Sequence, residues 1–335
     1  KRRPFLIAEL SGNHNKSLKK CKELIKIAKK NGADAVKIQT YTPDTITINC
    51  KKNDFLINQG IWKGNNLYEL YSKAFTPIEW HKELFNYAKK LNILLFSTPF
   101  DPIFVDYLEQ FSPPAYKIAS FEINVLDLIK RISETKKPII MSVGMSNLKE
   151  IEKSLNVINK YGSGKCCILY CVSGYPTPIK EFNLNSINYL KEKLNVPIGL
   201  SDHTLGNHVA CAATAMGVSI IEKHLIKSRK DKGPDSQFSM EPDELLNLRK
   251  DTTLIWSSLG KKNLFIKKSE KSNIRYRRSL YFIENIKKGS LINNKNLKCI
   301  RPGYGDNPEN LKKYLGKRAV KNISLGTRAS LRLVK

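Results

Sequence analysis

The stretch that decides the fold lies between Pro197 and Ser236. It reads PIGLSDHT (197–204), an alanine-rich segment, SIIEKHLI (219–226) and KGPDS (232–236). His203 and His224 each follow a short apolar run, so both imidazoles emerge at one end of a sheet if the runs are neighbouring parallel strands. Imidazole nitrogens suit divalent transition metals, and the spacing therefore favours a metal site. The alternative is that each histidine only bonds to a backbone group.

Short apolar runs alternate with helical patterns from Phe5 to about Gly260. Eight runs read as strands: Phe5–Glu9, Ala35–Gln39, Ile93–Ser97, Ala115–Ala119, Pro138–Val143, Cys166–Cys171, Ile198–Ser201 and Ser219–Glu222. A helical segment follows each run, and eight such units predict a (β/α)8 TIM barrel. The alternative is an open doubly wound sheet, which would require a glycine fingerprint after the first strand. The segment SGNHN at 11–15 lacks it.

Two helix starts and one long connection are also visible. Ser17 and Asn147 precede amphipathic segments and are expected to be N-caps. Residues 40–75 are too many for a plain connection and form a candidate functional loop. His14, close to the first strand, is a candidate functional residue, whereas His81 is expected on the surface of a helix.

The pattern changes after the barrel. Residues 1–260 are expected to form the catalytic domain, and residues 261–273 a Lys-rich linker. Residues 274–335 read as short strands with glycine turns, which predicts a small β-rich domain. A domain of that size is near the lower limit for folding alone and is expected to dock on something.

The charge balance raises a second class of function. The chain has 58 Lys and Arg against 30 Asp and Glu, a formal net charge of +28, and this raises the alternative of a nucleic-acid or polyanion binder. The lysines are spread along the whole chain, mostly on helix faces, so we favour a solvated basic surface that attracts an anionic substrate, with no nucleic-acid partner.

The spacing of the cysteines and the length of the apolar runs indicate in which cellular compartment the protein works. The seven cysteines are an odd number without a CxxC pair, which favours a reducing, cytoplasmic environment over a disulfide framework. No run approaches the length needed to cross a bilayer, so no membrane partner is expected.

Polar side chains follow the predicted strands. Lys37 and Lys117 alternate with buried residues on the second and fourth strands, and two lysines in one barrel mouth would repel unless a dianion lay between them. Hydroxyls at the same end of the barrel come from Thr98, Ser120, Ser142 and Ser201. Lysines with hydroxyls make a cradle for phosphate and carboxylate groups. The alternative is that the lysines extend to the solvated rim.

Three carboxyl groups are candidate acids or bases: Glu9, Glu122 and Asp235. Glu9 ends the first strand, which favours a place in the site. Asp235, in a Gly-Pro turn, is equally consistent with a turn carboxylate. Arg301, in the rigid turn RPGYG (301–305), is a weak candidate for binding an anion or polyol.

Nine motifs in order resemble the sialic acid synthase family over nearly the whole chain. They are IAELSGNHN, ADAVKIQTY, FSTPFD, AYKIASFE, YPTP, GLSDHT, EKH, GPDS and RPGYG. Within the family, INQGIWKGNNLYELYSKAFTP (57–77) and FEI (121–123) are most similar to the pseudaminic acid branch. Other nonulosonate synthases, for N-acetylneuraminate or legionaminate, are the close alternative.

The resemblance implies a TIM barrel followed by a C-terminal antifreeze-like (SAF) domain, in a domain-swapped homodimer. It implies condensation of phosphoenolpyruvate with the open-chain aldehyde of an amino sugar, assisted by Mn²⁺ or by Mg²⁺ or Co²⁺. In the pseudaminic branch the sugar is 2,4-diacetamido-2,4,6-trideoxy-L-altrose.

The resemblance also implies roles for particular residues. The metal ligands would be His203 and His224. The phosphoenolpyruvate contacts would be Lys37, Thr98, Lys117, Ser120, Ser142, Ser173 and Ser201. The sugar contacts would be Glu9, Gln39, Asn58, Tyr175, Asp235 and, from the other subunit, Arg301. Catalysis would fall to Glu9, Lys37, Lys117 and Glu122.

The chain departs from the family pattern at three places. Leu225-Ile226 stands where the family usually has Phe-Thr, Ser173-Gly174 replaces a pair that often contains Asn, and the loop before Trp62 is one residue shorter than in most pseudaminic relatives. The missing hydroxyl at Ile226 raises a further alternative, a regulatory barrel without activity.

Replacing His224 by Ala is expected to abolish metal-dependent activity and leave the fold intact, because one of two protein ligands is lost. Phosphate release and circular dichroism measure the two effects. Full activity in this variant would refute the metal assignment.

Overall fold

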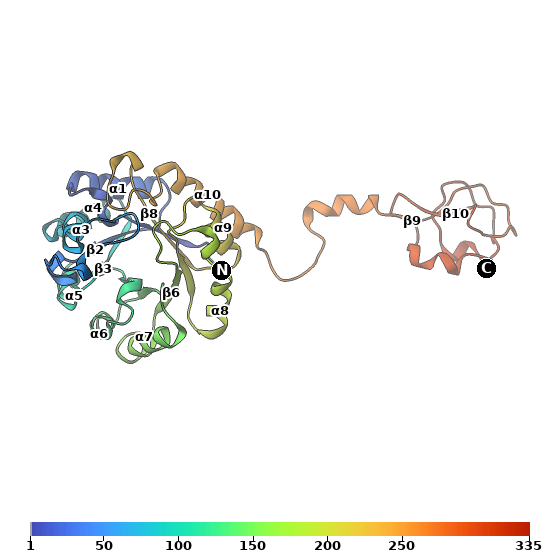
Figure 1. Cartoon of the computed structure of the whole chain (residues 1–335). Coiled ribbons are helices and arrows are strands. Elements are labelled where there is room, and N and C mark those ends of the chain that lie inside the picture. The colour runs from blue at the N-terminus through green and yellow to red at the C-terminus, as the bar shows by residue number, and fades with distance from the viewer. Residues whose placement is uncertain (1) are drawn as a thin grey trace. The chain divides into compact units, whose positions relative to one another are not determined.

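The computed structural model describes residues 2–335 and divides the chain into two units. The first ends at Gly260, and the second runs from Lys261 to Lys335. Each unit has its own hydrophobic core (Figure 1).

The first unit is a closed barrel of eight parallel strands, in the order of the chain. The strands are β1 (Phe5–Glu9), β2 (Ala35–Thr40), β3 (Leu94–Pro99), β4 (Tyr116–Ile118), β5 (Ile139–Ser142), β6 (Cys166–Cys171), β7 (Ile198–Ser201) and β8 (Ile220–His224). The pairing of β1 with β8 closes the barrel, and it sets Glu9 opposite His224. The predicted TIM barrel is confirmed, and β1, β6 and β7 have the predicted bounds.

Helices surround the barrel (Figure 1). They are α1 (Leu18–Lys30), α2 (Pro43–Ile46), α3 (Leu67–Ala74), α4 (His81–Lys90), α5 (Pro102–Glu109), α6 (Leu126–Glu134), α7 (Leu148–Tyr161), α8 (Asn185–Lys193), α9 (His208–Ala215) and α10 (Pro242–Ser258). Among residues 2–335, no helix combines the length and the apolar character that a membrane span requires.

Both predicted N-caps are confirmed. The Ser17 side chain accepts a hydrogen bond from the backbone N–H of Lys20 and satisfies a free donor of the first turn. Asn147 and Glu150 form a capping box at the start of α7.

The barrel interior has an apolar floor and a polar mouth. Ile7, Ala35, Phe96, Ile140 and Leu169 belong to one buried apolar cluster inside the barrel. Side chains alternate between the two faces of a strand, so the residue two positions further along points into the barrel one layer higher. Those residues are Glu9, Lys37, Thr98, Ser142 and Cys171. The same alternation that fills the core therefore delivers polar groups to the carboxyl ends of the strands.

The second unit contains a two-stranded antiparallel sheet, β9 (Ser279–Phe282) with β10 (Leu297–Ile300), and a small core. The predicted linker lies at its start, and residues from Lys268 onward form a 3-10 helix, Lys268–Tyr276. The hydroxyl of Tyr314, a fully buried core residue, donates to the carboxylate of Asp306.

The expected position of His81 is wrong. Its side chain is completely buried at the first position of α4, and Nε2 lies 2.8 Å from Oγ1 of Thr40 on β2. The ring also packs against Tyr107 and Phe111. His81 therefore fixes α4 against the barrel, a contact between distant segments that helical periodicity does not reveal.

Arg249 of α10 ties together the amino-terminal ends of β1 and β2. Its guanidinium donates to Gly32 O (2.7 Å), to Pro4 O (3.1 Å) and to the Asp34 carboxylate. Replacing Arg249 by Ala is expected to lower the free energy of unfolding by about 2–4 kcal/mol, because mostly buried acceptors lose their donors.

Chemical denaturation of the barrel measures this loss. The matched control is Arg131→Ala, which breaks an exposed pair with Asp106 and is expected to cost less than about 1 kcal/mol. Equal losses in the two variants would contradict the role of Arg249.

Candidate active site

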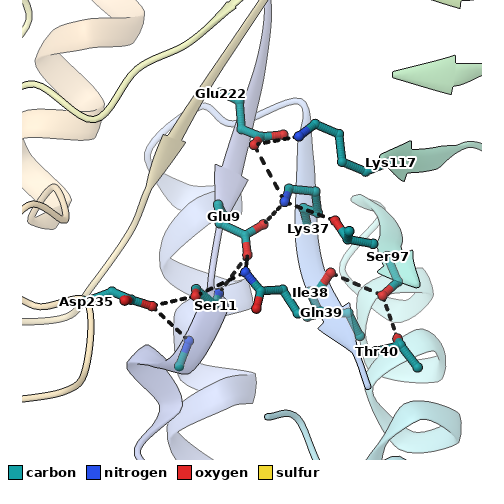
Figure 2. Close-up of polar contacts among 12 residues, drawn as sticks. Glu9, Ser11, Lys37, Ile38, Gln39, Thr40, Ser97, Lys117, Glu222 and Asp235 are labelled. Carbon is teal, nitrogen blue, oxygen red and sulfur yellow. Dashed lines mark hydrogen bonds and ion pairs between the residues drawn. The ribbon is translucent and has the colours of Figure 1, made fainter. Parts of the chain in front are cut away.

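Four buried charged residues meet inside the barrel mouth and form what we call the lysine–glutamate network: Glu9, Lys37, Lys117 and Glu222. Nζ of Lys37 lies 2.7 Å from Oε2 of Glu9 and 3.5 Å from Oε1 of Glu222. The same oxygen of Glu222 lies 3.5 Å from Nζ of Lys117. Figure 2 shows Glu222 extending from β8 to the two ammonium groups. The two lysines thus share a carboxylate.

Burial is the largest influence on the pKa of each member. It raises the pKa of the Glu9 carboxyl and lowers that of the Lys117 ammonium. At Lys37 the carboxylates of Glu222 and Glu9 outweigh burial and raise the pKa. At Glu222 the ammonium groups of Lys117 and Lys37 outweigh burial and lower the pKa. Lys37 and Glu222 therefore hold their charges, whereas the charged forms of Glu9 and Lys117 are disfavoured.

Glu222 is the member whose role sequence reasoning missed. It lies two residues before His224 on β8, so both side chains point into the barrel. That alternation was the available signal, because a carboxylate inside a barrel that holds two lysines is a natural counter-ion.

Hydroxyl groups and a backbone amide adjoin the lysines. Thr98 Oγ1 accepts from Nζ of Lys37 at 3.2 Å. The Gly144 N–H donates to Ser120 Oγ at 3.0 Å, and a Cβ on Gly144 would lie 2.3 Å from Ser173 Oγ. A side chain at Gly144 would displace these hydroxyls, so glycine lets the backbone lie close to both serines. Such a group of donors suits an anion.

Two further serines belong to this side of the mouth. Ser142 ends β5, and its buried Oγ has no hydrogen-bond partner within the described chain, residues 2–335. Ser201 ends β7, is buried, and lies opposite Glu222 in the sheet register. A ligand oxygen would satisfy the Ser142 hydroxyl.

A second polar group surrounds the other oxygen of Glu9 (Figure 2). Gln39 Nε2 donates to Glu9 Oε1 at 3.1 Å and to Ser11 Oγ at 3.2 Å. Ser11 Oγ and the Gly12 N–H both donate to the Asp235 carboxylate. Asp235 is buried, and burial raises its pKa. Asp235 is thus a turn residue whose carboxylate is buried in the site, and Ser11 is a member that sequence reasoning missed.

The two histidines meet beside this network, with ring centroids 5.4 Å apart. His203 Nδ1 lies 3.1 Å from the Val172 carbonyl oxygen, which can only accept, so Nδ1 carries the proton and Nε2 offers a lone pair. Buried His224 Nδ1 has no hydrogen-bond partner among residues 2–335. Two available ring nitrogens on adjacent imidazoles fit a divalent transition metal.

Other metal ligands are not gathered around the histidines. Across the part of the chain that the structure describes, no group of three or more His, Cys, Asp and Glu is placed to hold an ion. A pair of imidazoles would leave coordination positions for water and substrate, as catalytic sites require.

Lys223 fixes the loop that carries His203. It lies between Glu222 and His224 on β8, so its side chain leaves the opposite face of the strand. Its buried Nζ donates to the Asp202 carboxylate (2.7 Å), to Thr204 O (2.8 Å) and to Gly206 O (3.1 Å). The ammonium therefore holds the Asp202 side chain before His203 and the backbone after it.

Three aromatic side chains pack together next to the histidines and form what we call the aromatic cluster: Trp62, Tyr175 and Phe238. The Tyr175 ring lies 4.4 Å from that of His203, and the Phe238 ring 4.8 Å from that of His224. Trp62 packs on Tyr175 at 5.4 Å. Trp62 and Phe238 were missed because loops far apart in the sequence bring them together.

Some predicted residues are not gathered here. Asn58 lies in the same loop as Trp62 but is exposed, and the structure gives it no contact with these groups within residues 2–335. Arg301 is exposed in the second unit. Glu122, in contrast, lies near the network, because burial raises its pKa and the ammonium groups of Lys117 and Lys37 act against that rise. It follows β4 in a short 3-10 helix, and its buried Oε2 has no hydrogen-bond partner within the same residues.

Comparison with known proteins gives two family matches. The NeuB family model matches residues 24–264, and the SAF domain model matches residues 277–327. The chain is 42% identical to a pseudaminic acid synthase of Campylobacter jejuni (subsp. jejuni serotype O:23/36), covering 96% of this chain and 94% of the relative. It is 38% identical to an N,N'-diacetyllegionaminic acid synthase of Campylobacter jejuni, covering 96% and 97%.

A solved structure agrees with these matches. The crystal structure of an N-acetylneuraminic acid synthetase from Leptospira borgpetersenii, in complex with citrate, superposes with a TM-score of 0.73 at 32% identity. The match covers 82% of this chain and 92% of that one.

Glu122 should give the stability of the barrel a pH dependence. Burial raises its pKa from 4.5 to about 7. Between these values the unfolded chain loses the proton and the folded chain keeps it, so stability falls as pH rises and then levels off. Glu122→Gln should remove this pH-dependent part of the unfolding free energy, which is at most about 3 kcal/mol.

The measurement is the difference in unfolding free energy between Glu122→Gln and the parent protein from pH 5 to pH 8. The difference should grow in favour of the variant as pH rises. The exposed Glu152→Gln on α7 is the control and should leave the curve unchanged. Parallel curves for all three proteins would show that Glu122 does not titrate in this range.

Proposed function

The chain belongs to the NeuB family, and from this premise we propose that it is a pseudaminic acid synthase. It condenses phosphoenolpyruvate with 2,4-diacetamido-2,4,6-trideoxy-L-altrose and water, and releases pseudaminate and phosphate. The observation that carries the proposal is the lysine–glutamate network beside the paired histidines, in a chain whose relatives include pseudaminic acid synthases.

Phosphoenolpyruvate binds at the lysine side of the mouth. Lys37 attracts its phosphate and carboxylate as an ammonium group, and the bound anion favours the charged form of Lys117. The carboxylate of Glu222 bridges the two lysines. Hydroxyl donors orient its oxygens: Thr98, Ser120, Ser142, Ser173 and Ser201. The Gly144 N–H positions the Ser120 hydroxyl. Because these groups are already buried, little reorganisation is needed when the anion binds.

His203 and His224 hold a divalent ion, Mn²⁺ or alternatively Mg²⁺ or Co²⁺, at the ring nitrogens not used by the protein. When bound, such an ion supplies Lewis-acid polarisation of the sugar aldehyde. The Val172 carbonyl fixes the His203 tautomer, and Lys223 fixes the loop around it, so the chain presents the two nitrogens in a set arrangement.

Two carboxyl groups, those of Glu9 and Glu122, accept and release protons during the reaction. Glu9 lies at the junction of the lysine side and the Gln39–Ser11–Asp235 side, and its raised pKa lets Oε1 or Oε2 hold a proton. Glu122, with a pKa of about 7, is able to accept and release a proton at neutral pH. We assign Glu9 to the sugar oxygen and Glu122 to the water that adds to phosphoenolpyruvate.

The sugar binds on the side of Glu9, Gln39 and Asp235, whose amide and carboxylate groups suit its hydroxyl and acetamido groups. Tyr175 and Asn58 are further proposed contacts. We also propose a domain-swapped homodimer in which the exposed Arg301 of one SAF domain reaches the barrel of the other chain. A cytoplasmic location agrees with the seven free cysteines.

A second candidate is a synthase for another nonulosonate. The 38% identity to a legionaminic acid synthase over 96% of the chain supports it. The two candidates share the chemistry and differ in the sugar.

The test incubates the full-length protein with phosphoenolpyruvate, Mn²⁺ and each candidate sugar, and follows phosphate release. We expect turnover with the altrose derivative and at least tenfold less with N-acetylmannosamine or the legionaminate precursor. Turnover only with N-acetylmannosamine would overturn the pseudaminic assignment. Lys37→Met is the matched control and should lose at least about 100-fold in rate, because it removes a preorganised charge.

A further inference from the structure

The aromatic cluster is assembled from three separate loops at the barrel mouth. Trp62 comes from the long connection after β2, Tyr175 from the loop after β6, and Phe238 from the loop after β8. The Trp62 ring lies 5.4 Å from Tyr175 and 6.4 Å from Phe238, and both of those rings contact the histidines. The three rings therefore form an apolar wall beside the paired imidazoles.

Trp62 is held in place by its one polar group. Indole Nε1 donates to the Pro234 carbonyl oxygen at 2.8 Å, which ties the loop of residues 57–64 to the segment that contains Asp235 and Phe238. With Nε1 occupied, the indole offers only its apolar ring to a ligand. Phe238 is fully buried, whereas Trp62 is half-buried, so part of the indole remains accessible.

The two walls of the site differ in chemistry. Asp235 follows Pro234 directly and belongs to the polar group with Ser11 and Gln39. A sugar that reaches these groups with its hydroxyls therefore has the Trp62 indole as a neighbour. A methyl group fits against the indole, but a hydroxymethyl group would lose hydration there without gaining a partner.

From this geometry we propose that Trp62 determines sugar specificity: its indole ring accepts the 6-methyl group of a deoxy amino sugar and disfavours the 6-hydroxymethyl counterpart. The inference rests on the proposed function, whose substrate has a methyl group at carbon six. It adds a residue to which neither the sequence motifs nor the polar network assign a role.

The experiment compares 2,4-diacetamido-2,4,6-trideoxy-L-altrose with its 6-hydroxy counterpart at saturating phosphoenolpyruvate and Mn²⁺, in the full-length protein. The ratio of kcat/KM for the two sugars is the readout. Trp62→Gln, which is polar, should lower the ratio about 10- to 100-fold, the range of discrimination expected of an apolar pocket. Trp62→Phe, which stays apolar, should keep most of the preference for the deoxy sugar. In both variants KM for phosphoenolpyruvate should change less than about twofold.

Trp256→Phe is the matched control, because Trp256 lies on α10, and should leave the ratio unchanged. An unchanged ratio in Trp62→Gln would overturn the inference, even if its rate fell. If the parent protein turns over only N-acetylmannosamine, the proposed function itself fails, and the role of Trp62 toward a 6-methyl group fails with it. If the parent protein turns over the deoxy sugar and Trp62→Gln leaves the ratio unaltered, only the role of Trp62 fails and the proposed function stands.

Discussion

The structure depends on burying two lysines and two glutamates together at the centre of a barrel, where Lys37 and Glu222 keep their charges through mutual contact. Desolvation alone would make these groups neutral, and only their mutual contacts offset it. Glu222 is the key member, since its carboxylate lies 3.5 Å from both lysines. Without it, Lys37 and Lys117 would repel each other in a dry interior. The barrel thus keeps the Lys37 ammonium charged although it is buried away from water.

Much of this fold could be predicted because period-two alternation is strong in parallel strands. The apolar runs gave the count of eight strands, and strand ends such as Glu9, Lys37 and Ser142 fall where inward-facing polar residues belong. Chain order alone also suggested that His203 and His224 are neighbours, since β7 and β8 pair in the barrel. Local patterns and a regular architecture were sufficient for these inferences.

The features that could not be predicted depend on contacts between distant segments. The Trp62 indole reaches Pro234 across 172 positions, and His81 reaches Thr40 across 41, so neither leaves a periodic signal. Asp235 was ambiguous because a Gly-Pro turn can be exposed or buried, and only its bonds to Ser11 and Gly12 decide between the two. Glu222 was visible at a strand end, but its role required knowing that Lys37 and Lys117 face it.

β8 carries different tasks on its two faces. Glu222 and His224 serve the interior, while Lys223 between them secures the turn that holds the other imidazole. A single inserted or deleted residue would exchange the two faces, so this strand does not tolerate insertions or deletions. The loop of residues 57–64 contacts the barrel mouth through the Trp62 indole, by its bond to Pro234 and its packing on Tyr175 and Phe238, and it belongs to no strand whose alternation would fix its length. On the proposed role of Trp62, remodelling this loop would change the acceptor sugar and leave the register of the strands beneath it as it is.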